Sequence, residues 1–250
     1  MKYAKKFSTS TQYNTWRAGN TYQTPSVAYI TDETKVIYNI VINTNGYTDY
    51  VDLGLPSGTL WSTMNLGAQS SSDVGDYLAW GEFYTKENYS LDYYELYNSR
   101  MGGYDPYGYF DNKTVLDLSD DVVNSTLGGS WHIPTRDQWQ EILDNTTMTP
   151  ATGGLTVEGP NGNTMCLPAT GFMMDNELTE SSTLVYMCNE VDSSFENSYL
   201  FILDESNQYL GINNIFRYYG YAIRPVAGKV KASSGNNNGG GGAEPEGPIK

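Results

Sequence analysis

The apolar positions that follow Thr135 recur with the period of an α-helix. Trp139, Ile142 and Leu143 fall at i, i+3 and i+4, which places them on one face of a helix. Thr135 can cap the N-terminus of this helix, and Gln138, three residues later, can return a hydrogen bond to the cap. The pattern predicts a buried amphipathic helix that begins at Thr135.

Shorter apolar runs, most of them bounded by glycine, proline or polar turns, make up the rest of the pattern. Runs of this length and setting are typical of β-strands. We expect strands at residues 60–66, 164–172, 199–203 and 221–226, and a partly helical segment at residues 73–84.

A long polar segment, residues 85–125, is rich in tyrosine and glycine. A connection of this length is usually functional or carries structure of its own. We interpret it as an insertion in the main domain.

The beginning and the end of the chain differ from its centre. Residues 1–48 predict a separate unit in which a short helix ending at Gly19 precedes a hairpin of strands at 26–30 and 35–42. The alternative is a small hairpin packed on the main domain.

The main domain then covers residues 49–227. Residues 228–250 are mostly glycine, asparagine, serine and proline, which cannot bury apolar surface, so we expect a flexible tail.

The composition is compatible with a binding protein but not with a protein that binds nucleic acid. Only 17% of the 250 residues are charged, whereas 22 are tyrosine and 26 are glycine. Tyrosine offers a large amphipathic contact area at low entropic cost, so this composition is typical of a contact surface. The alternative interpretation of the same composition is a loop-rich β protein with polar strands. The formal net charge of −15 argues against nucleic-acid binding, because phosphate contacts need clustered lysine and arginine.

The sequence carries no recognisable address for export. Its N-terminus is charged and has no apolar core segment, so we expect no signal peptide and synthesis in the cytoplasm. No apolar run reaches the length of a membrane span, so we expect no membrane insertion. Cys166 and Cys188 are too few for a disulfide framework, and we expect free thiols.

Candidate catalytic chemistry is sparse. His132 is the only histidine, and one histidine with two distant cysteines supplies neither a hydrolytic triad nor a zinc site. Arg217 and Arg224 favour a structural role, in which the guanidinium holds carboxylates or backbone carbonyls. Asp76 and Glu82 are candidate carboxylate partners.

Four segments, in the same order along the chain, resemble a known family. They read VDLGLPSGTLW at 51–61, GDYLAWGE at 75–82, SWHIPTRDQWQEIL at 130–143 and GYAIRPV at 220–226. Together they resemble the major paralogous domain of gut Bacteroides-type bacteria and their phages. That domain is similar to the formylglycine-generating-enzyme branch of the C-type lectin-like fold.

The resemblance covers roughly residues 50 to 227 and implies an α+β fold. We expect a C-type lectin-like domain with a twisted antiparallel sheet and one long helix, preceded by the small helix-hairpin unit.

The resemblance does not carry the catalytic or calcium-binding features of relatives with this fold. Neither cysteine lies in the context of the copper-binding cysteine pair of the formylglycine-generating enzymes, so we expect no enzyme. The acidic residues near the last strands, such as Asp192 and Glu196, do not match the tripeptides that bind calcium and sugar in C-type lectins. We expect no cofactor, and a structural calcium ion has no support from the sequence.

In some relatives, diversity-generating retroelements rewrite the C-terminal part of the domain, which corresponds here to residues 185–219. The chain departs from the family at 186–189, where YMCN replaces the frequent YWSS. Asparagines and tyrosines alternate through the segment, and we expect it to bind a ligand, with residues 85–110 as a second presenting segment. The candidate ligand-binding residues are Tyr186, Asn189, Phe195, Asn197, Leu200, Ile202, Asp204, Tyr209, Asn213, Asn214, Phe216, Tyr218 and Tyr219.

Within this segment, the family pattern predicts the exposure of alternate residues in the strand at 199–203. It places Leu200, Ile202 and Asp204 on the outer face, and the residues between them on the core face. The alternative is a strand that is buried on both faces.

These observations favour a binding protein on a phage particle. The opening helix and hairpin resemble the N-terminal segments of structural proteins of Bacteroides phages, so this unit is expected to dock to other virion proteins or to sister subunits. The expected ligand is a host-surface protein or glycan, and the expected assembly is a homo-oligomer, with a trimer favoured for avidity. A purely structural decoration protein of the capsid or tail, and a bacterial surface adhesin, remain as alternatives.

Overall fold

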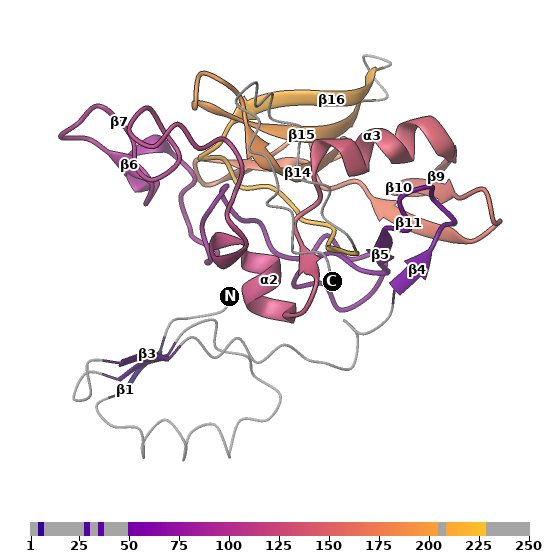
Figure 1. The fold of residues 1–250 in the computed structure, drawn as a ribbon, viewed down its shortest axis with the longest axis horizontal. Helices are drawn as coiled ribbons and strands as arrows, with labels where there is room; N and C mark the ends of the chain where they lie inside the picture. The colour runs from indigo at the N-terminus through magenta and orange to yellow at the C-terminus, as the bar shows by residue number, and fades with distance from the viewer. Residues whose placement is uncertain (1–4, 8–27, 31–34, 38–49, 205–208, 229–250) are drawn as a thin grey trace, which may run out of the picture.

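The computed structural model describes residues 5–7, 28–30, 35–37, 50–204 and 209–228. The described chain consists mostly of antiparallel β-strands with few helices, so its class is α+β with β-structure predominating (Figure 1). No helix among these residues is long and apolar enough to cross a membrane.

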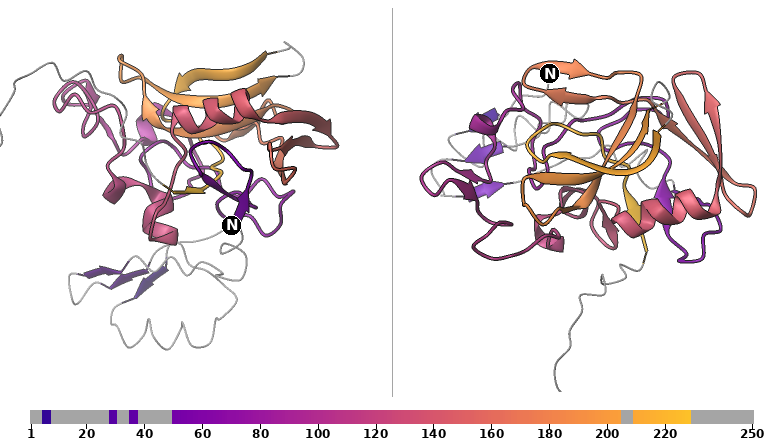
Figure 2. Two further views of the ribbon diagram at one scale, coloured as in Figure 1. Left: turned by 45° about the vertical axis from the view of Figure 1, so that its right-hand side comes forward. Right: turned by 90° about the horizontal axis from the view of Figure 1, so that it is seen from above.

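Three long antiparallel strands form the sheet that organises the domain. They are β14 (Leu184–Val191), β15 (Asn197–Asp204) and β16 (Tyr209–Phe216), in that spatial order. Helix α3 (Arg136–Asn145) packs beside all three strands (Figures 1 and 2). β16 is an edge strand of this sheet.

A second sheet joins the beginning and the end of the domain. Its order is β4 (Tyr50–Asp52), β5 (Leu60–Ser62), β17 (Val226–Ala227) and β8 (Trp131–His132). The pairing of β17 with β5 and with β8 is antiparallel. The sheet therefore ties segments that are far apart in the sequence to the strand that leads into α3.

Smaller elements surround these two sheets. β9 (Thr147–Ala151), β10 (Gly154–Glu158) and β11 (Thr164–Pro168) form an antiparallel meander, and β12 (Phe172–Met174) pairs with β13 (Glu177–Thr179). The remaining elements of the domain are short: η1 (Leu91–Tyr93), β6 (Tyr97–Asn98), β7 (Gly103–Tyr104), η2 (Leu118–Asp120) and α2 (Val122–Leu127).

The two strands of the hairpin expected near the N-terminus are present in the described residues 28–30 and 35–37, and the other residues of these expected strands lie outside the described part of the chain. β2 (Ala28–Ile30) and β3 (Lys35–Ile37) are antiparallel, and β1 (Lys5–Phe7), which the sequence did not predict, pairs with β2 in parallel. The helix expected before this hairpin and the tail after residue 228 lie outside the described residues.

Helix α3 confirms the prediction made from its apolar period and its cap. The hydroxyl oxygen of Thr135 accepts a hydrogen bond from the Gln138 backbone amide at 3.1 Å, and the Gln138 side chain accepts one from the Thr135 amide at 2.9 Å. Trp139 and Ile142 are completely buried. Trp139 stacks on Phe201 of β15 with ring centroids 4.4 Å apart, so the helix is fixed to the sheet by its apolar face.

The partly helical segment expected at residues 73–84 is wrong, because no helix forms there. Gly75 and Gly81 adopt φ angles of 75° and 76°, in the left-handed region that interrupts a right-handed helix. Between them, Leu78 forms a backbone bridge to Tyr221, with its amide donating to the Tyr221 carbonyl at 3.0 Å. The strand expected at 60–66 is also shorter and ends at Ser62.

The insertion at residues 85–125 builds a second hydrophobic core. Tyr94, Tyr104 and Tyr107 from this segment are buried, and they join one cluster with Leu200 and Ile202 of β15. A separate cluster on the other side of the β14–β16 sheet contains the α3 and β15 side chains that pack together. The central sheet is therefore covered on both faces.

This arrangement corrects the expected exposure of β15. Leu200 is completely buried and Ile202 is 7% exposed, so neither points to solvent. Phe201, between them, is buried in the opposite core. The alternative, a strand buried on both faces, is the arrangement found, and residues of the insertion belong to the cluster that contains Leu200 and Ile202.

Candidate binding face

Three aromatic side chains cluster where the chain leaves β16. Phe216 is 40% exposed, and Tyr218 and Tyr219 are partly exposed. The rings of Phe216 and Tyr218 are stacked at 5.1 Å with an interplanar angle of 15°, and Tyr219 meets Tyr218 edge-on at 4.9 Å. Phe172 of β12 stacks against Tyr219 at 5.7 Å, which supports the cluster from within.

Arg217 anchors this turn in the interior. Its side chain is fully buried, and Nε donates a hydrogen bond to the hydroxyl of Tyr94 at 2.8 Å. Nη1 donates to the carbonyls of Tyr107 at 2.6 Å and Phe195 at 3.3 Å. The guanidinium also lies 4.4 Å from the centroid of the Trp80 ring. The turn is therefore fixed to three other segments through one side chain.

The backbone at the two carbonyl acceptors is unusual. Tyr107 has a φ of 63° and Phe195 a φ of 62°, in the left-handed region that bulky residues rarely occupy. Such conformations persist when the surrounding structure holds them in place, and both carbonyls here point to the same nitrogen of Arg217. Arg217 thus holds two strained loops as well as its own turn.

The structural role expected of both arginines is confirmed. Arg224 is fully buried and donates to the carbonyls of Ser62 at 3.1 Å and Cys166 at 2.8 Å. Glu82, one of the carboxylates considered as a partner, forms an ion pair with Lys86 at 2.7 Å. Burial raises the pKa of Glu82, and the charge of Lys86 opposes that rise.

A network of amides and one carboxylate adjoins the aromatic turn. Asp192 accepts hydrogen bonds from the side chains of Ser194 at 2.6 Å, Asn197 at 2.9 Å and Asn214 at 2.8 Å. Partial burial acts to raise the pKa of Asp192, but the hydrogen bonds from Ser194 and Asn197 outweigh it and hold the pKa below its usual value. Asn213, next to Asn214 in β16, is exposed.

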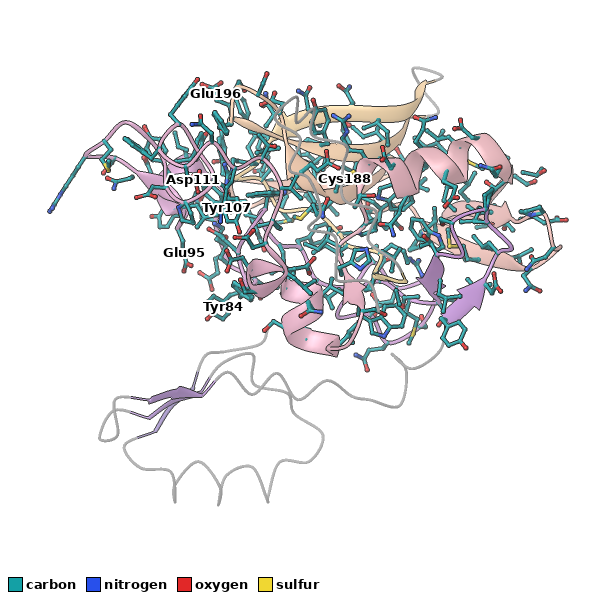
Figure 3. The ribbon with its side chains drawn as sticks, viewed as in Figure 1. Tyr84, Glu95, Tyr107, Asp111, Cys188 and Glu196 are labelled. Carbon is teal, nitrogen blue, oxygen red and sulfur yellow. The ribbon has the colours of Figure 1, made fainter. Side chains whose placement is uncertain are left out.

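The insertion contributes two further exposed rings. Tyr109 is 67% exposed and packs edge-on against Phe195, with centroids 5.0 Å apart, and Phe110 is 56% exposed. The carboxylate of Asp111 accepts hydrogen bonds from the backbone amides of Tyr107 and Gly108, which closes this loop. Figure 3 shows Tyr107, Asp111 and Glu196 on one flank of the molecule.

We call the exposed and partly exposed residues of the insertion and of the β16 turn the aromatic face. The ring of Tyr109 contacts the ring of Phe195. Phe195 lies two residues before Asn197, and Asn197 is opposite Phe216 in the β15–β16 pair. The residues of the aromatic face are Tyr109, Phe110, Asn213, Phe216, Tyr218 and Tyr219.

The structure separates the candidate ligand-binding residues into two groups. Asn197, Asn213, Asn214, Phe216, Tyr218 and Tyr219 are exposed or partly exposed around the β16 edge and its turn. Four others, besides Phe195, were expected at a binding surface but lie in the interior: Tyr186, Asn189, Leu200 and Ile202. The side chains of Asp204 and Tyr209 lie outside the described part of the structure.

The buried candidates have evident structural roles. Tyr186 donates its hydroxyl hydrogen to the Pro168 carbonyl at 2.7 Å, and its ring packs against Trp139. The backbone of Asn189 bonds to Pro134 at 2.9 Å, which joins β14 to the turn before α3. Phe195 is 6% exposed and supports Tyr109 from below rather than forming the surface itself.

Sequence reasoning did not single out Tyr109 and Phe110. The signal available was the run of tyrosine and glycine in the insertion, but four other tyrosines in the same run, at positions 89, 94, 104 and 107, are buried. Composition therefore points to the segment without separating its core residues from its surface residues.

The remaining reactive side chains have structural surroundings. His132 is buried, with Nδ1 at 2.8 Å from the Ser130 carbonyl and Nε2 at 3.3 Å from the Gln138 side chain, within the turn that leads into α3. Cys166 and Cys188 are free thiols, as expected, and burial raises the pKa of Cys188. Within the described residues, no three His, Cys, Asp or Glu side chains lie together as a metal site.

No family model, no curated protein and no solved structure matches this chain.

Proposed function

We propose that this chain is a surface protein of a phage virion and that its domain presents the aromatic face to the host surface. The main observation behind the proposal is that the aromatic rings of the face are exposed whereas the residue that fixes their turn is buried. The exposed ring of Phe216 and the partly exposed ring of Tyr218 lie on a turn that the buried Arg217 fixes to three other segments. Rigid aromatic side chains give large contact areas with little loss of entropy on binding, which is why they dominate binding hot spots.

The polar surroundings of the face suit recognition. The amide of Asn213 is exposed, and that of Asn214 is partly exposed beside it. Amides can donate and accept hydrogen bonds, so they provide orientation where aromatic rings provide area. We propose a binding role rather than a catalytic one, with a host-surface protein or glycan as the ligand.

The C-type lectin-like fold is part of this proposal. Three of the segments that resemble the major paralogous domain carry strands of one sheet, β4–β5–β17–β8. The remaining segment, residues 75–82, is joined to the last resembling segment by the bridge between Leu78 and Tyr221. The resembling segments thus come together in space, with β5 of the first segment paired to β17 of the last, which supports a single domain.

The assembly proposed for the virion has two further parts. Residues 1–48 would dock to other virion proteins or to sister subunits, and the protein would act as a homo-oligomer, with a trimer favoured because several weak sites then bind together. A structural decoration protein is the second candidate, since the same exposed rings would also suit a permanent contact with a capsid neighbour.

A binding assay with matched variants tests the proposal. The purified chain, labelled with a fluorophore, would be incubated with a panel of Bacteroides-type strains and measured by flow cytometry. The variants are Phe216→Ser on the aromatic face and Tyr50→Ser as a control. Both positions are exposed aromatic residues, but Tyr50 lies in β4, outside the aromatic face.

We expect Phe216→Ser to weaken cell binding at least tenfold, about 1.4 kcal/mol or more, as for a residue near a hot spot. Tyr50→Ser should bind like the unmodified chain. Equal binding by both variants would contradict the proposal. Loss of incorporation into particles by Phe216→Ser, with no cell binding by any form, would favour the decoration protein.

A further inference from the structure

The aromatic face carries acidic side chains at its margin. Asp111 follows the exposed Tyr109 and Phe110 directly, and Glu196, which is exposed, follows Phe195 under Tyr109. Asp192 lies in the same turn as Glu196 and stays ionised at neutral pH, because hydrogen bonds from Ser194 and Asn197 lower its pKa. Figure 3 places Asp111 and Glu196 on the same flank.

The described cations near this margin are already engaged. Lys113 forms an ion pair with Asp117 at 2.5 Å, and its Nζ lies 5.8 Å from the centroid of the Tyr107 ring. Arg217 is fully buried beneath the face. The charge of Lys113 helps to lower the pKa of Asp111, but no described lysine or arginine forms an ion pair with Asp192 or Glu196.

Aromatic rings of this chain hold its own cations in several places. The guanidinium carbon of Arg136 lies 4.1 Å from the centroid of the Tyr199 ring, and that of Arg217 lies 4.7 Å from the centroid of the Tyr104 ring. A cation over a ring gains electrostatic attraction from the π-system, and a nearby carboxylate adds to it. Exposed rings beside ionised carboxylates could therefore bind a cation of a partner in the way that Tyr199 and Tyr104 bind the arginines of this chain.

On these observations, and resting on the proposed function, we infer that the partner of the aromatic face is a lysine- or arginine-rich segment of a protein. The net charge of −15 adds long-range attraction for such a segment and raises the rate of encounter. A neutral glycan could also stack on the rings and donate hydroxyl hydrogens to the carboxylates, but it has no charge for the carboxylates to attract. The charge of the margin therefore favours a basic protein segment over a neutral glycan as the ligand of this face.

The test measures the affinity of the full chain for three probes. These are a short peptide of alternating arginine and serine, the same peptide with glutamate in place of arginine, and an array of neutral glycans. Tyr109→Ser and Glu196→Gln alter the face and its margin. Their matched controls are Tyr50→Ser and Glu158→Gln, because Tyr50 and Glu158 are exposed in β4 and β10, outside the aromatic face.

We expect the arginine peptide to bind, and the glutamate peptide and the glycans not to bind. Tyr109→Ser should weaken the arginine peptide about tenfold, and Glu196→Gln about threefold, with a smaller effect of Glu196→Gln at high salt because salt screens exposed charges. The control variants should bind like the unmodified chain.

Three results would overturn the inference. Equal weakening by face and control variants would indicate diffuse attraction to the acidic chain. Glycan binding that depends on Tyr109 would assign the face to the other ligand class. Absence of binding by the arginine peptide would exclude a basic segment. In the last two cases, the proposed function would still hold if cell binding depended on Phe216. If cell binding did not depend on Phe216, both the proposed function and this inference would be contradicted.

Discussion

Replacing Arg217 by methionine is the sharpest test of how the aromatic face is supported. Methionine keeps much of the length and apolar character of the side chain but cannot donate hydrogen bonds. The change leaves the carbonyls of Tyr107 and Phe195 without their shared donor, and it leaves the Tyr94 hydroxyl without the bond from Nε. Contact of the guanidinium with the Trp80 ring is lost as well.

The size of the effect follows from these contacts. A hydrogen bond from a charged donor contributes about 1.5–3 kcal/mol, and a desolvated cation over an aromatic ring contributes about 2 kcal/mol. Three such hydrogen bonds and the ring contacts are lost, but the cost of burying the charge, several kcal/mol, disappears with them. We expect a net loss of about 3 kcal/mol in the free energy of unfolding, because the lost contacts outweigh both the relief of burying the charge and any relief of backbone strain at Tyr107 and Phe195.

Equilibrium unfolding in urea, followed by tryptophan fluorescence, measures this loss. For a domain of this size, about 3 kcal/mol corresponds to a fall of roughly 6–12 °C in the melting temperature. Arg217→Lys should lose about 2 kcal/mol or more, since a lysine cannot form the planar fork. Arg100→Met, at an exposed position, is the control and should stay within about 0.5 kcal/mol. An Arg217→Met protein as stable as this control would refute the anchoring role.

Three other predictions concern the core, the helix cap and the tyrosines. Leu200→Ala should cost about 2–5 kcal/mol in urea unfolding because Leu200 is buried, whereas Leu178→Ala, which alters an exposed residue, should change stability by less than about 0.5 kcal/mol; equal values would restore an exposed β15 face. Thr135→Ala removes the cap of α3 and should cost about 1 kcal/mol, with an unchanged melting temperature contradicting the capping box. Burial raises the pKa of Tyr186 from 10.0 to about 12, and burial likewise raises the pKa of Tyr94, so the unfolded chain loses these protons first as pH rises. Stability should therefore be constant below pH 10 for these groups and fall above it, which thermal unfolding at stepped pH would measure, and a flat profile above pH 10 would exclude the effect.

Local rules predicted the parts of the fold that depend on neighbouring residues. The beginning of α3 follows from Thr135 and Gln138, which are three residues apart and bond to each other. The apolar face of the helix follows from its period, and Trp139 and Ile142 are buried as that period requires. No distant segment is needed for either result.

The exposure of β15 could not be predicted in this way. Leu200 is buried in a cluster that includes tyrosines of the insertion, about a hundred positions earlier in the chain, together with residues of several other distant segments. The continuous apolar run at 199–203 is compatible with burial on both faces, but the run itself does not show which distant segments cover the second face. The helix expected at 73–84 failed for a related reason, since the bridge from Leu78 to Tyr221 joins distant segments.

The candidate site was predicted as a segment but not as a surface. Phe216, Tyr218 and Tyr219 were identified from their composition and position, and they are at least partly exposed. Tyr109 and Phe110 were not, because their place beside the β16 turn depends on the contact with Phe195 and on the bonds of Arg217. Long-range polar contacts of this kind leave no pattern in a single sequence.

The measurement that tests the central claim most directly is sequencing of the codons for residues 180–226 across a natural population. If the aromatic face is a binding surface that is diversified, substitutions should concentrate at exposed positions such as Asn213, Phe216 and Tyr218. Leu200 and Arg217, which are buried, should stay constant. A uniform sequence, or substitutions spread equally over buried and exposed positions, would contradict the claim and favour a structural decoration protein.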